Sequence, residues 1–186
     1  MRLTELEQVT FRQHVQSVLL EEKMWQLDEY IQHGQTTRLE HCVAVAYFSY
    51  WVYCRLHLQG NAYHLVRGAL LHDFFLYDLR EERPKNHISN HPYHALENAS
   101  SCFMLNEEEC DIIKNHMWPL TLALPAYKST LVVSIIDKAC AITEFFQLQY
   151  GDSLLALGFG VPRPHIARVA LRRARNILVL AAKMRP

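Results

Sequence analysis

Six residues of metal-binding type are spread along the chain so that each lies in or beside a segment with a helical pattern of apolar residues. In chain order they are His41, His72, Asp73, His91, His116 and Asp137. Imidazole nitrogens and carboxylate oxygens are common ligands of divalent metals. Inside one helical domain, this set can hold two divalent cations and activate a water between them. An unrelated hydrogen bond in the core could explain any one of these residues, but a single dimetal centre explains all of them together.

Three of these residues interrupt strongly apolar runs. His72 and Asp73 interrupt one such run, and Asp137 interrupts the run 131–142, where nearly every other residue is apolar. A buried carboxylate needs a cation or several hydrogen-bond donors to offset its desolvation. Lys138 is not expected to be that cation, because adjacent residues of a helix point about 100° apart. The apolar context therefore favours bound metal.

The composition is that of a globular chain with a helical tendency. Half of the 186 residues are hydrophobic, and there are only 6 glycines and 7 prolines, which suits one domain with a sizeable core. The formal net charge is zero, so total charge gives no reason to expect nucleic acid or an anionic membrane as a partner. The 11 histidines are the unusual feature, and histidine is both a metal ligand and an acid–base group near neutral pH.

Cysteine usage and the N-terminal residues favour a cytoplasmic protein. The 5 cysteines have no Cys-x-x-Cys spacing, which argues against a disulfide framework or a zinc ribbon and favours reduced thiols. The first residues contain no apolar signal core, and the longest apolar run, 42–54, is too short to cross a bilayer. We therefore expect a cytoplasmic protein that does not associate with a membrane.

The apolar periodicity predicts an all-α bundle in a single domain, with no convincing strand. Pro92 is expected in the first turn of its helix, after a long loop over 74–91. The predicted domain consists of an N-terminal helical extension, a metal-binding core and a C-terminal basic helix, over 1–34, 35–148 and 149–186. The predicted helices cover 3–31 (as one or two helices), 37–58, 62–73, 92–105, 107–116, 128–148 and 165–183.

In these residues the chain resembles the HD-domain metal-dependent phosphohydrolase superfamily, in the binuclear variant with the order His, His-Asp, His, His, Asp. The resemblance extends over about 38–144 and looks closest to small stand-alone bacterial HD proteins, a group that includes dinucleoside polyphosphate hydrolases. Many HD phosphodiesterases have lysine three positions after the dyad aspartate, where this chain has Leu76, so a signalling-type cyclic dinucleotide activity is not expected. The resemblance is strongest in Arg38-Leu-Glu-His41, Ala69-Leu-Leu-His72-Asp73, His91-Pro-Tyr-His-Ala95, Ile113-Lys-Asn-His116 and Ile136-Asp137-Lys138.

The resemblance implies a role for each metal ligand. One cation would be held by His41, His72 and Asp137, the second by His91 and His116, and Asp73 would bridge the two. The imidazole-rich set favours iron or manganese, with zinc, nickel or magnesium as further candidates.

Three histidines compete for the position of the third single histidine in the series. His87, His91 and His94 all lie in this part of the chain. We favour His91 because it precedes Pro92 and because Ala95 follows at the small-residue position of the family. His94 would then line the pocket or support a ligand, and His87 would lie on the loop.

The expected activity is hydrolysis of a phosphate ester or anhydride of a nucleotide or small metabolite, with Asp73, Arg38 and His94 as catalytic residues. Arg38 shares a helix face with His41 and could grip a phosphate, although an internal ion pair is the alternative. His94 or Asp78 would protonate the leaving group. Two other functions remain open, a diiron oxygenase of the HD fold and a non-catalytic, metal-stabilised nucleotide-binding module. Nucleic acid is not the expected partner, because the arginine-rich helix over 165–183 has an apolar packing face.

Overall fold

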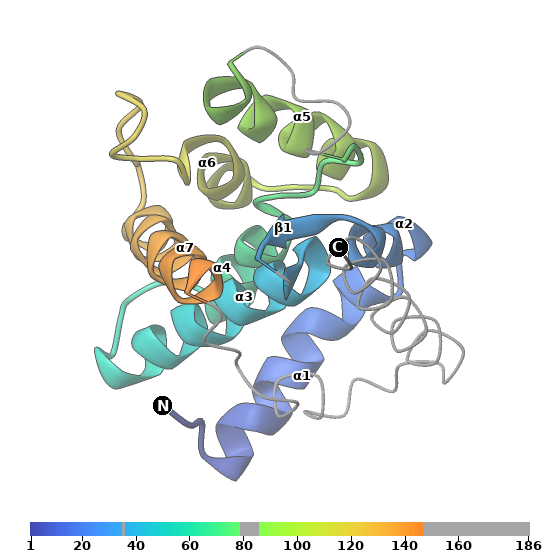
Figure 1. Ribbon diagram of the computed structural model, residues 1–186. Helices are drawn as coiled ribbons and strands as arrows, with labels where there is room; N and C mark the ends of the chain where they lie inside the picture. The colour runs from blue at the N-terminus through green and yellow to red at the C-terminus, as the bar shows by residue number, and fades with distance from the viewer. Residues whose placement is uncertain (35, 79–85, 147–186) are drawn as a thin grey trace.

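The computed structural model describes residues 1–34, 36–78 and 86–146 (Figure 1). The predicted all-α class is confirmed, because helices make up nearly all of the regular structure in these residues. The helix predicted over 165–183 lies outside the described residues. The helices are α1 (Glu5–Leu19), α2 (Glu22–Gln26), α3 (Arg38–Arg55), α4 (Ala62–Leu71), α5 (His87–Cys102), α6 (Glu107–Asn115) and α7 (Lys128–Phe145), with a 3₁₀ helix η1 (Leu27–Glu29).

Helix α3 lies at the centre of the bundle, as its nearly uniform apolar character predicts. Its residues from Cys42 to Tyr47 are all buried, and it packs against both α4 and α7. Helix α4 also contacts α1 on one side and α6 on the other, while α5 packs on α6 at the end of the molecule away from α1 (Figure 1). The central helices therefore separate the N-terminal helix from the α5–α6 pair.

A short β-hairpin replaces the end of the helix predicted over 3–31, so the expectation of a structure without strands was wrong. Strand β1 (Ile31–His33) pairs antiparallel with β2 (Thr36–Thr37). Gly34 takes a φ of +56° between them, a conformation that costs glycine little. Its α-carbon faces α7 so closely that a β-carbon there would stand 2.8 Å from the Glu144 carbonyl oxygen. The hairpin is therefore fixed by tertiary contact, which apolar periodicity does not report.

Helix α5 begins at His87, so the expected start at Pro92 was wrong. Pro92 lies inside the helix and is buried. The residue before the helix, Asn86, has a φ of +62°, which turns the chain into the helix earlier than the proline rule predicts. The additional residues place His87 one turn before His91.

Reciprocal capping boxes begin three of the described helices, α1, α3 and α6. The Thr37 hydroxyl accepts a hydrogen bond from Glu40 N at 3.2 Å, and the Glu40 carboxylate accepts one from Thr37 N at 2.9 Å. Asn106 and Glu109 form the same reciprocal pair at the start of α6, as the predicted Asn106 cap requires. Each box fixes where its helix starts and thereby which side chains face the core.

Helices α4 and α6 approach closely where Gly68 faces Ile112. A β-carbon at position 68 would stand 2.6 Å from Ile112 Cδ1, well inside contact distance. The contact lies one helical turn before His72 on one chain segment and one turn before His116 on the other.

No helix among the described residues is both long and apolar enough to cross a membrane. The five cysteines all lie in the described residues, and none of them forms a disulfide.

Candidate metal centre

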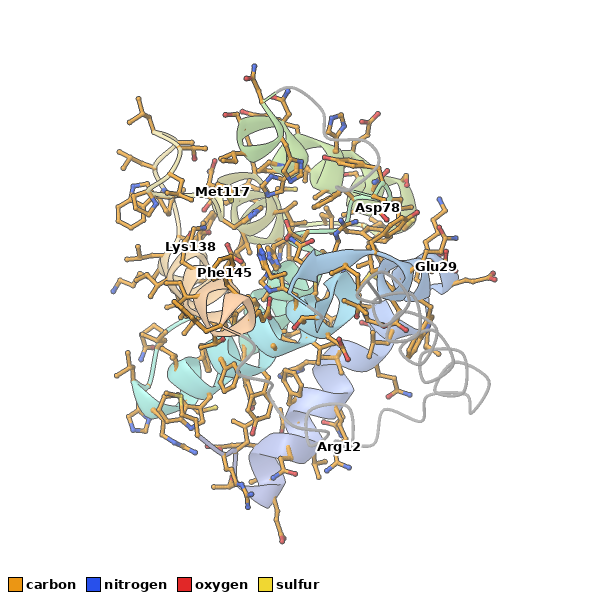
Figure 2. All side chains as sticks on the ribbon, in the orientation of Figure 1. Arg12, Glu29, Asp78, Met117, Lys138 and Phe145 are labelled. Carbon is orange, nitrogen blue, oxygen red and sulfur yellow. The ribbon has the colours of Figure 1, made fainter. Side chains whose placement is uncertain are left out.

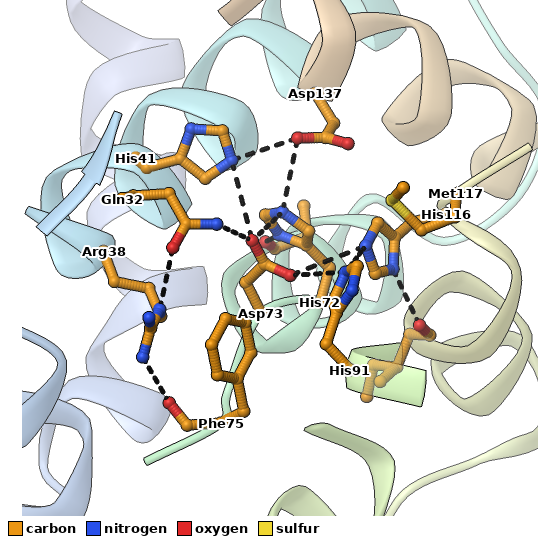
Figure 3. A network of polar contacts seen from close by, with 12 residues as sticks. Gln32, Arg38, His41, His72, Asp73, Phe75, His91, His116, Met117 and Asp137 are labelled. Carbon is orange, nitrogen blue, oxygen red and sulfur yellow. Dashed lines mark hydrogen bonds and ion pairs between the residues drawn. The ribbon is translucent and has the colours of Figure 1, made fainter. Parts of the chain in front are cut away.

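The six predicted metal ligands meet at one buried point between the helices (Figure 3). Helices α3, α5 and α7 each contribute one side chain, and the residues that follow α4 and α6 contribute the others. Their exposed fractions lie between 0% and 7%, so all six are buried. The side chains are His41, His72, Asp73, His91, His116 and Asp137.

The first half of the centre consists of His41, His72, Asp137 and the Oδ2 atom of Asp73. His41 Nε2 lies 3.0 Å from Asp137 Oδ1 and 4.0 Å from Asp73 Oδ2. His72 Nε2 lies 3.6 Å from each of the same two oxygens. Ligand atoms held about 2.1 Å from one cation stand roughly 3.0–3.5 Å apart. His41, His72 and Asp73 therefore form one group that could hold a metal ion, with Asp137 beside it.

The second half of the centre consists of His91, His116 and the Oδ1 atom of Asp73. The Nε2 atoms of the two histidines lie 3.0 Å apart. Asp73 Oδ1 lies 3.2 Å from His91 Nε2 and 3.5 Å from His116 Nε2. These three atoms also have the spacing of ligands around a single cation.

Hydrogen bonds on the far side of each second-half imidazole fix which nitrogen carries the proton. His91 Nδ1 donates to the His87 carbonyl oxygen at 2.9 Å, and His116 Nδ1 donates to the Ile113 carbonyl oxygen at 2.8 Å. A carbonyl oxygen can only accept, so the Nε2 atom of each neutral ring carries a free lone pair. Two such lone pairs and a carboxylate oxygen therefore point at one another.

The close approach of these three acceptor atoms indicates whether the residues suit a metal ion. Three acceptors in contact repel unless a proton on His91 or a cation lies between them. Asp73 Oδ1 and His72 Nε2 are both buried without a hydrogen-bond partner among the described residues. One divalent cation in each half satisfies all of these atoms, so the donor set fits a dimetal centre.

His41 is the most strongly held histidine of the group. Its Nδ1 atom lies 3.0 and 2.9 Å from the two carboxylate oxygens of Glu144, and its Nε2 atom faces Asp137. Burial pushes the pKa of His41 down, but the hydrogen bonds to Asp137 and Glu144 outweigh it and raise the pKa to about 10. Burial and the neighbouring His72 lower the pKa of His116 to about 3. His41 therefore binds a proton much more tightly than His116 does.

The two aspartates of the centre stay ionised. Burial raises the pKa of Asp73, but the charge of the neighbouring His72 outweighs burial and holds that pKa well below the usual range. The pKa of Asp137 is also held well below its usual range, because the hydrogen bond from His41 and the charge of His72 outweigh burial. Carboxylates in the charged form are the species that bind cations.

The structure adds Glu144, Gln32 and His33 to the residues around the centre. Glu144 supports His41 and is 2% exposed, and its place two helical turns after Asp137 on the same face was a signal that the sequence carried. The Gln32 amide donates to Asp73 Oδ2, and no pattern in the sequence indicated this contact. The His33 ring lies 5.5 Å from the His41 ring, and these two histidines with Glu144 form a further group spaced for a metal ion.

Lys138 is a partner of Asp137, so the expectation that adjacent helical residues could not pair was wrong here. Lys138 Nζ lies 2.9 Å from Asp137 Oδ2 and also donates to the His116 carbonyl oxygen. The long lysine side chain bends back along the helix, which offsets the angle between neighbouring side chains. Met117 and Lys138 lie on the side of the molecule where α6 meets α7 (Figure 2).

Arg38 lies beside the centre in a wholly internal position. Its side chain is 0% exposed, and its guanidinium carbon is 3.6 Å from the centre of the Phe75 ring. Its Nη1 atom donates to the carbonyl oxygens of Phe75 and Tyr77, and only Nη2 lacks a partner among the described residues. This geometry favours the alternative internal role over direct contact with a phosphate.

The three competing histidines of α5 take different places. His91 is the one whose imidazole joins the group of ligands. His87 stacks on His91 with ring centres 4.7 Å apart, and its Nδ1 atom lies 3.0 Å from the Tyr77 hydroxyl. His94 is exposed, with its ring centre 6.0 Å from that of Tyr77. Its predicted role as leaving-group acid stays a prediction.

Comparison of the chain with models of known protein families, with curated proteins and with solved structures gives no match.

Proposed function

We propose that the chain is a metal-dependent phosphohydrolase with a dimetal centre of the HD-domain type. One observation carries the proposal: three acceptor atoms, His91 Nε2, His116 Nε2 and Asp73 Oδ1, converge in the protein interior next to a second set of ligand atoms that shares Asp73. A protein core tolerates such a cluster when cations offset the repulsion. The residue series that resembles the HD superfamily is the same set of six.

Different residues of the chain have different roles in the proposed reaction. Asp73 would be shared by two divalent cations, and the imidazole-rich set favours iron or manganese. When bound, two divalent cations polarise a phosphoryl group and make water a better nucleophile at neutral pH. Glu144 holds the Nδ1 proton of His41, so that Nε2 faces the centre. Burial of the whole group excludes bulk water and strengthens its electrostatic interactions.

The substrate class is a phosphate ester or anhydride of a nucleotide or small metabolite. Hydrolysis breaks the bond between phosphorus and the leaving oxygen, and that oxygen takes up a proton as the bond breaks. His94 on α5 is the residue that we assign to this proton transfer. No argument from the described residues assigns nucleic acid or a membrane as the partner.

Elemental analysis followed by a panel of phosphatase and phosphodiesterase substrates tests the proposal. We expect two transition-metal ions per chain and phosphate release that chelation abolishes and that iron or manganese restores. A metal-loaded protein without turnover on any substrate of the panel would overturn the hydrolase assignment. Oxygen consumption by the iron-loaded protein would then identify the oxygenase alternative, and tight nucleotide binding without turnover would identify the binding module.

A further inference from the structure

The side-chain amide of Gln32 connects the hairpin to the carboxylate that both halves of the centre share. Gln32 Nε2 donates to Asp73 Oδ2 at 2.5 Å (Figure 3). The other end of the amide, Oε1, accepts a hydrogen bond from Arg38 Nε at 2.8 Å. A guanidinium group can only donate, so this contact decides which end of the amide faces Asp73. Arg38 therefore orients the Gln32 amide, and the amide in turn orients the carboxylate of Asp73.

Arg38 is itself held rigidly on the far side of Gln32. Its Nη1 atom donates to the Phe75 carbonyl oxygen at 2.7 Å and to that of Tyr77 at 3.1 Å. Its backbone N–H donates to Tyr30 O at 2.8 Å, just before β1. Arg38 thus joins the hairpin, the start of α3 and the segment that follows Asp73. A side chain held at these points has little freedom to swing toward a substrate.

The two oxygens of Asp73 differ because of this contact. Oδ2 accepts the hydrogen bond from Gln32 and faces His41 and His72, whereas Oδ1 has no hydrogen-bond donor and faces the second half. Without the Gln32 donor, the carboxylate could rotate about its terminal bond, away from the plane in which one oxygen faces each half. A bridging ligand requires one oxygen toward each cation.

We propose that Gln32 is a positioning residue that sets the bridging orientation of Asp73, and that Arg38 acts through Gln32 rather than on the substrate. This inference rests on the dimetal centre of the proposed function and goes beyond it, because it makes the hairpin part of that centre. Residues that support metal ligands typically contribute about 10–100-fold to metal affinity.

Cobalt titration of the metal-free, full-length protein tests the inference without any substrate. The variant is Gln32→Met, which keeps the length of the side chain and removes its hydrogen bonds. Gln8→Met is the matched control, because Gln8 is also half-buried and its Nε2 atom makes one hydrogen bond, to Leu3 O at 3.0 Å. Cobalt absorption bands report the geometry of the bound ion.

We expect Gln32→Met to weaken the tighter cobalt site by about 10–100-fold and to change its absorption bands, while Gln8→Met binds as the wild type does. The thermal unfolding midpoint of the metal-free protein should fall by a similar amount in both variants. Unchanged cobalt affinity in Gln32→Met overturns the inference and leaves the proposed function standing. A wild-type protein that binds no cobalt overturns both.

A double-mutant cycle with Arg38→Lys tests the role of Arg38, because lysine keeps the charge but has no Nε–H to orient the amide. We expect Arg38→Lys to weaken cobalt binding in the wild-type background and to have no further effect in the Gln32→Met background. Normal cobalt binding with weaker inhibition by inorganic phosphate would instead place Arg38 on the substrate and overturn its role through Gln32. If Arg38→Lys does not fold, the Gln32→Met comparison decides alone.

Discussion

The two halves of the metal centre are built from similar ligands but are supported differently. In the first half, His41 is backed by the carboxylate of Glu144, and Asp137 adds a second negative charge. In the second half, His91 and His116 are backed only by main-chain carbonyl oxygens. A carboxylate behind an imidazole makes it a stronger donor, and more negative charge attracts a cation more strongly. We therefore expect the first half to bind metal more tightly and the second half to exchange it more readily.

Asp73→Ala should have the largest effect, because Asp73 is the one residue that both halves share. We expect the bound metal to fall from two ions per chain to none, and turnover to fall by more than the roughly 100-fold that loss of a supporting residue costs. Elemental analysis and phosphate release measure the two effects. Two retained metal ions with full turnover would exclude a bridging role for Asp73.

His116→Ala should remove one half and leave the other. We expect one tightly bound ion per chain and loss of turnover, because the first half keeps all of its ligands. The matched variant His41→Ala should lose the tight site instead, and competition with a chelator distinguishes the two. If both variants lose the same site, the division of the centre into two halves is wrong.

Glu144→Gln should weaken only the first half. The neutral amide can still accept the His41 Nδ1 proton, but it no longer increases the electron density on Nε2. We expect about a 10–100-fold loss of affinity at the tight site and an unchanged weak site, measured by cobalt titration. Equal loss at both sites would show that Glu144 supports the fold of the centre rather than one half of it.

We expect pH to change metal affinity less than these substitutions do, and to change it differently in the two halves. Before metal binds, His41 keeps its second proton until the pH approaches its pKa of about 10, and a cation must displace that proton. Affinity of the first half should therefore rise with pH, by at most about tenfold per unit across neutral pH. His116, with its pKa near about 3, has no such proton to lose. Cobalt titrations between about pH 6.5 and 8.5 measure the difference; parallel slopes would contradict it.

The six side chains that meet at the candidate centre could be selected from the sequence because their helical register and apolar surroundings together determine which way they point. That they bind metal stays a prediction. His72, Asp73 and Asp137 each interrupt an apolar run, so their burial followed from the pattern of their neighbours. His91 was separated from two nearby histidines by its place before Pro92 and by the resemblance, although the helix start expected at Pro92 was itself wrong. The helical class and the capped start of α6 at Asn106 were predictable for the same local reasons.

The supporting residues could not be found in this way, because their roles depend on contacts between distant segments. Gln32 lies in a strand that exists because the hairpin packs on α3 and α7, and no local pattern marks it. Lys138 reaches Asp137 through the flexibility of its side chain, which an argument from helix angles does not include. Glu144 was the exception, since it shares a helix face with Asp137.

The close contact of Gly68 with Ile112 sets the distance between the two chain segments that carry His72 and His116. The imidazole rings of these histidines lie 4.8 Å apart, one turn beyond the contact. Adding a single methyl group at Gly68 would force the two helices apart or displace Ile112. The spacing of His72 and His116, two of the proposed ligands, therefore depends on a side chain that consists of one hydrogen atom.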